Sequence, residues 1–164
     1  MRPGSFVLTL ILLGALTISG CFFVSKSEVL KRVRSALPNV EITTDVFEVN
    51  SQCFLTSFDI RDELTAEQVL QSSALSSFRS LGKRWYEFAS FDAMIEDPTA
   101  GVNPKIADAI SYAVGAAKPC LTKAGLTFDA FYVEPIVVTY SKFGGSVLFF
   151  FKKDLSKAYY LVGD

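Results

Sequence analysis

The last forty residues of the chain hold its densest run of strand-forming side chains, and they constrain the fold more than any other feature. Gly144-Gly145 has the composition of a tight hairpin turn, and 153–156 is a second turn. Strands joined by turns this short pair antiparallel, so we expect a C-terminal β-meander. Four segments rich in aromatic and β-branched residues are its expected strands: 128–133, 136–143, 147–152 and 158–162.

Earlier segments predict further strands and about three helices. Alternating apolar residues predict strands over 40–49, 53–60 and 84–91. The expected helices begin at Ser27, at Thr65 with capping-box spacing, and at Asn103-Pro104 with a proline in the first turn; they end near Leu37, Leu81 and Lys118. Strands and helices come in blocks, which indicates a single α+β domain over 27–164, with an antiparallel sheet and the helices mainly on one face.

Aromatic side chains occur on both faces of the expected C-terminal strands. Phe149, Phe150 and Phe151 are consecutive, and so are Tyr159 and Tyr160. If helices cover one face only, the other exposes rings such as Phe149, Phe151, Tyr159 and Tyr160, which would form a partner surface. The alternative is a sheet covered on both faces, which needs no partner.

Composition excludes several function classes. The chain has no histidine, the commonest general base and metal ligand, and its formal net charge is −1. We therefore expect no metal, no cofactor and no nucleic-acid partner. Carboxylates such as Glu87 and Asp92 are the available acid–base groups, so a small hydrolase that uses them is one alternative function. A carrier of a small hydrophobic ligand is another, and it requires a cavity of several hundred cubic ångströms.

The N-terminus has the pattern of an export signal. Arg2 precedes an uncharged apolar run from Phe6 to Ile18, and Ile18-Ser19-Gly20-Cys21 follows. A branched residue, two small residues and a cysteine at the end of such a run resemble the lipobox of bacterial lipoproteins. The resemblance covers residues 1–21 only.

This resemblance implies a signal peptide over 1–20, cleavage before Cys21, lipid on its thiol and a lipidated tether over 21–26. It also implies an extracytoplasmic domain held on a bacterial membrane. Phe22 stands where an aspartate tends to retain lipoproteins at the inner membrane of enteric-type bacteria, so it favours the outer membrane. The alternative is an uncleaved membrane helix, because the apolar run continues to Val24 and is close to the roughly 20 residues that span a bilayer.

Lipid on Cys21 leaves Cys53 and Cys120, an even number in an exported chain, which favours a disulfide between them over two buried free thiols. The function that these patterns favour is a membrane-anchored envelope lipoprotein with a non-catalytic binding or assembly role. Its partner would be an envelope protein, a lipid or a cell-wall component. The first expected helix carries a basic face close to Cys21, which either contacts anionic headgroups or is simply solvated.

Overall fold

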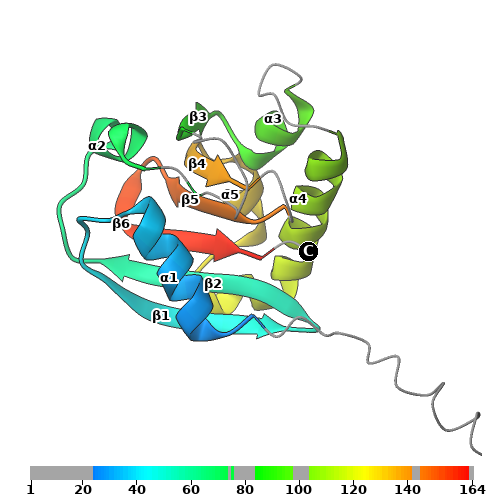
Figure 1. Ribbon diagram of the computed structural model, residues 1–164. Coiled ribbons are helices and arrows are strands. Elements are labelled where there is room, and N and C mark those ends of the chain that lie inside the picture. The colour runs from blue at the N-terminus through cyan, green and yellow to red at the C-terminus, as the bar shows by residue number, and fades with distance from the viewer. Residues whose placement is uncertain (1–23, 74, 76–83, 98–103, 142–144, 163–164) are drawn as a thin grey trace, which may run out of the picture.

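A computed structural model describes residues 24–73, 75, 84–97, 104–141 and 145–162. Its centre is a six-stranded antiparallel sheet in the order β1-β2-β6-β5-β4-β3 (Figure 1). The strands are β1 Ile42–Asn50, β2 Cys53–Ile60, β3 Tyr86–Phe88, β4 Ile136–Tyr140, β5 Val147–Phe151 and β6 Asp154–Leu161. The expected α+β class and C-terminal meander are confirmed, because β4, β5 and β6 are consecutive antiparallel neighbours.

Four of the described helices, α1, α2, α3 and α5, begin after a residue whose side chain caps them. Ser25, and not the expected Ser27, caps the first helix by accepting a hydrogen bond from the Glu28 amide, and Thr65 and Gln68 form the expected capping box. The helical elements are α1 Lys26–Ala36, α2 Ala66–Gln71, α3 Phe91–Glu96, α4 Pro104–Ala117, the 3₁₀ segment η2 Lys118–Ala124 and α5 Phe128–Val133.

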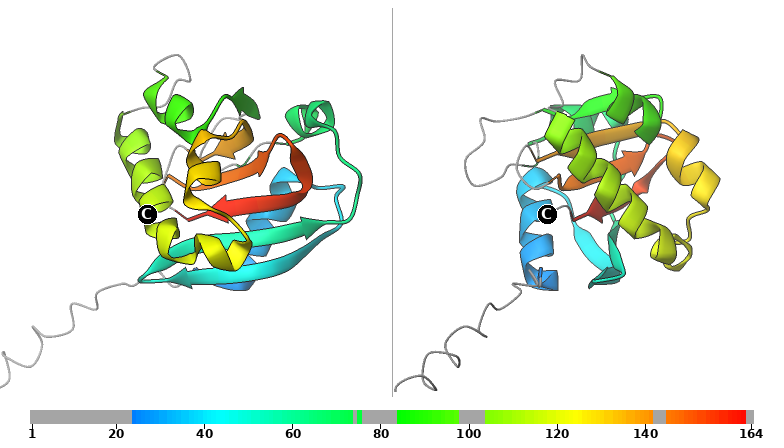
Figure 2. Two further views of the ribbon diagram at one scale, coloured as in Figure 1. Left: turned by 180° about the vertical axis from the view of Figure 1, so that it is seen from behind. Right: turned by 90° about the vertical axis from the view of Figure 1, so that its right-hand side faces the viewer.

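Helices cover both faces of the sheet, and each face has its own apolar core. The larger group, α3, α4, η2 and α5, packs on one face, while α1 and α2 pack on the other (Figure 2). Alternate residues of β5 divide between the two cores: Phe149 and Phe151 enter the first, and Leu148 and Phe150 enter the second. Most of the helices lie on one face, as expected. The described residues form five α-helices instead of about three, and two of them, α1 and α2, cover the other face.

Two expected strands are wrong in part or in whole. Residues 128–133 form helix α5, because Thr127 caps it by accepting a hydrogen bond from the Ala130 amide. Within 84–91 only Tyr86–Phe88 is a strand, because Ser90 caps the next helix by accepting from the Ala93 amide. The turn expected at 153–156 lies two positions earlier, since Phe151 pairs with Asp154 across Lys152-Lys153. The continuation of the second helix towards Leu81 lies outside the described residues.

Candidate functional site

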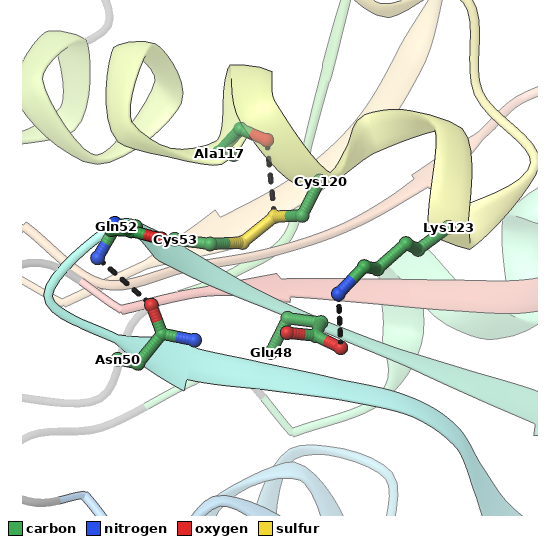
Figure 3. Close-up of a disulfide and its surroundings, with 7 residues drawn as sticks. All are labelled: Glu48, Asn50, Gln52, Cys53, Ala117, Cys120 and Lys123. Atoms are coloured by element: carbon green, nitrogen blue, oxygen red, sulfur yellow. Dashed lines mark hydrogen bonds and ion pairs between the residues drawn. A yellow bond between two sulfur atoms is a disulfide. The ribbon is translucent and has the colours of Figure 1, made fainter.

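Cys53 and Cys120 are joined in a disulfide, as the cysteine count predicts. Cys53 begins β2 and Cys120 lies in η2, and their Cα atoms are 6.2 Å apart (Figure 3). Both residues are buried in the core between the sheet and the larger helix group. The bond therefore fastens that helix layer to the hairpin end of the β1–β2 pair.

Local sequence explains why the two cysteines meet. Asn50 turns the chain between β1 and β2, because its side-chain oxygen accepts a hydrogen bond of 2.8 Å from the Gln52 amide. Pro119 stands in the first turn of η2, and Gly125 ends it with a φ of 73°. A second link lies beside the disulfide, where Lys123 donates to Glu48 at 2.8 Å (Figure 3).

The expected aromatic partner surface is wrong. Phe149, Phe151, Tyr159 and Tyr160 are 0%, 4%, 5% and 0% exposed. The reason is that helices cover both faces. The group α3, α4, η2 and α5 covers Phe149, Phe151 and Tyr159, while α1 and α2 cover Tyr160 on the other face. The alternative stated from the sequence, a sheet covered on both faces, is the one that the structure has.

These rings pack in the core and stabilise the domain, and they are not accessible to a partner. Phe149 stands at right angles to the ring of Phe91, with the centroids 4.6 Å apart, and it stacks on Tyr159 at 5.2 Å. Burial raises the pKa of Tyr159 to about 12, since the ionised phenol would lose its hydration. Tyr160 lies on the opposite face, where its hydroxyl accepts a hydrogen bond from Arg32 of α1.

The two carboxylates proposed for a hydrolase differ in their surroundings. Glu87 lies on the short edge strand β3, is well exposed and forms an ion pair with Lys152 at 2.5 Å. Asp92 is in the first turn of α3 and lines a pocket of about 210 Å³ between α3, α4 and α5. The pocket is lined by Asp92, Ile95, Glu96, Ser111, Val114 and Tyr132.

Sequence reasoning did not identify this pocket as a place where acids converge with a tyrosine. Asp92 and Glu96 are four residues apart, which places them on one face of a helix, but 84–91 reads as a strand and hides where α3 begins. Burial, together with the charge of Asp92, raises the pKa of Tyr132.

Cys21 and the residues of the cleavage motif, Ile18, Ser19 and Gly20, lie outside the described residues. Within the described ranges, no helix is long and apolar enough to cross a membrane. The same ranges contain no cluster of three His, Cys, Asp or Glu side chains that could hold a metal ion.

Comparison with known proteins identifies no relative. No family of known proteins matches the sequence, no curated protein is significantly similar to it, and no solved structure matches the fold.

Proposed function

We propose that this chain is a lipoprotein of the bacterial envelope, anchored by lipid on Cys21, whose domain has a non-catalytic binding or assembly role. The observation that carries the proposal is the use of the three cysteines. Cys53 and Cys120 are paired with each other, so Cys21 is the remaining cysteine of the three. Cys21 stands at the end of a lipobox-like sequence, where its thiol would be the acceptor of the lipid.

Two structural features agree with an exported, anchored domain. Disulfides persist in oxidising compartments outside the cytosol and are rare within it. The first helix is capped by Ser25, only four residues after Cys21. Four extended residues span at most about 14 Å, so lipid on Cys21 would hold the domain close to the membrane surface.

A binding role is placed before catalysis because of how the carboxylates are arranged. The charge of Glu87 is offset by Lys152 on an exposed edge of the sheet. The pocket that contains Asp92, at about 210 Å³, is below the roughly 300–1,000 Å³ that small-molecule sites usually have. These features give less support to a hydrolase or to a carrier of a hydrophobic ligand.

Metabolic labelling with an alkyne analogue of palmitate tests the lipid anchor. The wild-type chain is expected to take up the label and to remain in the membrane fraction after a wash with high salt. Cys21→Ala should lose both properties. The matched control, Cys53→Ala with Cys120→Ala, removes two cysteines and should keep the label. Label that persists in Cys21→Ala would overturn the assignment of the anchor.

Complementation of a deletion strain separates binding from catalysis. Glu87→Gln and Asp92→Asn each preserve side-chain size and remove the charge, and a binding or assembly role predicts that both variants restore the wild-type phenotype. A variant that is made at normal abundance but fails to complement would favour the hydrolase.

Density-gradient separation of the membranes tests the outer-membrane assignment, and Phe22→Asp is expected to move the protein to the inner membrane where the enteric sorting rule applies.

A further inference from the structure

Helix α1 carries three cations that have no partner within the described part of the chain: Lys26, Lys31 and Arg34. Several cations elsewhere are engaged by acids, as Lys123 is by Glu48, or lie over rings, as Lys118 does over Phe128 at 4.4 Å. The single acid of α1, Glu28, binds Arg32 at 3.2 Å and so leaves the charges of the other three cations unopposed on this helix.

The positions of these cations place them away from the core. Val29, Val33 and Ala36 are the buried residues of α1 and pack against the sheet. With 3.6 residues per turn, Lys31 and Arg34 project from the opposite side of the helix, and both are exposed. Lys26 is also exposed and lies at the start of the helix. We call these three residues the α1 basic face.

The basic face contrasts with the charge of the whole domain. Removal of residues 1–20 takes away one cation, Arg2, and leaves fifteen cations against seventeen acids, a net charge of −2. Helix α1 has four cations and one acid, a net charge of +3. Positive charge is therefore concentrated on one short helix of a chain that is otherwise acidic.

This helix is also the element closest to the anchor along the chain. Lys26 is five positions after Cys21, a reach of at most about 17 Å, and α1 is itself about 16 Å long. We propose that the α1 basic face lies on anionic phospholipid headgroups, so that α1 sets the orientation of the domain on the membrane. The proposal rests on the proposed function, because it needs the chain to be held at a membrane by its N-terminal end.

Lysine footprinting of the purified full chain in vesicles tests the contact. The protein is reconstituted in neutral phosphatidylcholine or in vesicles with 30% phosphatidylglycerol, acetylated with a membrane-impermeant reagent and digested, and the rate at each lysine is measured by mass spectrometry. Lys26 and Lys31 should react at least about fivefold more slowly in the anionic vesicles. The reason is that each cation near such a surface raises the ratio of docked to undocked protein about fivefold. Lys105 and Lys118, on the other side of the sheet, should react within twofold of the same rate in both. Salt at 1 M should abolish the protection.

A charge variant and its matched control make the test specific. Lys31→Gln with Arg34→Gln is expected to lower the ratio of docked to undocked protein about 25-fold and to return Lys26 to its rate in neutral vesicles. Lys105→Gln with Lys118→Gln removes the same charge from the other face and should leave Lys26 protected. Equal rates at Lys26 in the two kinds of vesicle would overturn the proposal.

The intact mass of the same sample keeps the two proposals apart. Acylated protein whose Lys26 and Lys31 react equally in both vesicles keeps the lipid anchor and refutes the contact of α1. Protein without acyl mass whose lysines are protected in the anionic vesicles refutes the anchor on Cys21 and supports the contact.

Discussion

Removal of the disulfide, by Cys53→Ala with Cys120→Ala, is expected to lower the free energy of unfolding by about 4 kcal/mol. The two cysteines are 67 positions apart. In the chain-entropy model, a closed loop of this size restricts the unfolded chain enough to stabilise the folded state by about 4 kcal/mol. The effect acts on the unfolded chain, so folded variants should keep the wild-type secondary structure.

Urea unfolding of the chain from residue 21, in a Cys21→Ser background, measures this difference. With a slope of about 2 kcal/mol/M, the midpoint should fall by about 2 M in the double alanine variant. Both cysteines are buried, at 3% and 2% exposure, so the alanines also remove packing atoms. Unfolding of the parent protein with the disulfide reduced keeps those atoms and isolates loop closure.

The outcome that refutes the reasoning is a loss below about 1 kcal/mol both on reduction and in the variant. That result would mean that the sulfurs are not bonded in the folded protein or that the unfolded chain is already compact. Loss in the alanine variant alone would assign the effect to packing. Cys21→Ser by itself should leave the midpoint unchanged, because the disulfide between Cys53 and Cys120 is retained.

Two further predictions follow from backbone geometry and from burial. Gly145→Ala should cost about 3 kcal/mol in urea unfolding, because the new Cβ would lie 2.5 Å from Ala109 Cβ at a φ of 57°. Gly125→Ala is its control: φ is 73° but no atom lies within 4 Å, so about 1 kcal/mol is expected, and equal losses would contradict the packing argument. Burial raises the pKa of Tyr140 and of Tyr159 to about 12, above their ordinary value of 10, so the unfolding midpoint should be level from neutral pH to pH 10 and fall as the pH rises from 10 to 12. Stability that is level up to pH 12 would contradict that burial.

Sequence patterns predicted the elements whose signals are local and redundant. Strand β2 has the predicted bounds Cys53–Ile60, and the capping box at Thr65 is present. Helix α4 begins at Pro104, as the asparagine–proline pair indicates. In each of these elements, residues typical of a helix or strand boundary agree with the spacing of the apolar residues.

Errors arose where composition and end signals disagreed. The aromatic residues of 128–133 favour a strand, but Thr127 caps a helix there and Phe131 packs on Phe91 and Phe149 of the core. Over only six residues, the strand period of two residues and the helix period of 3.6 residues give similar apolar patterns. The capping threonine was therefore the better indicator of a helix.

The burial of the sheet could not be predicted because it depends on where distant helices pack. The strands alone do not show that α1 and α2 lie over Phe150 and Tyr160, which follow them by about a hundred residues. The disulfide was predictable because the expected export signal uses one of three cysteines and leaves a single possible pair. The pocket at Asp92 was not, because it forms only when α3, α4 and α5 come together.

The most direct test of the central claim is the intact mass of the protein from the membrane fraction, after thiol alkylation with and without reducing agent. We predict a chain that begins at Cys21, carries added acyl mass and gains two alkyl groups only after reduction. A full-length chain from Met1, or a chain from Cys21 without acyl mass, would contradict the account.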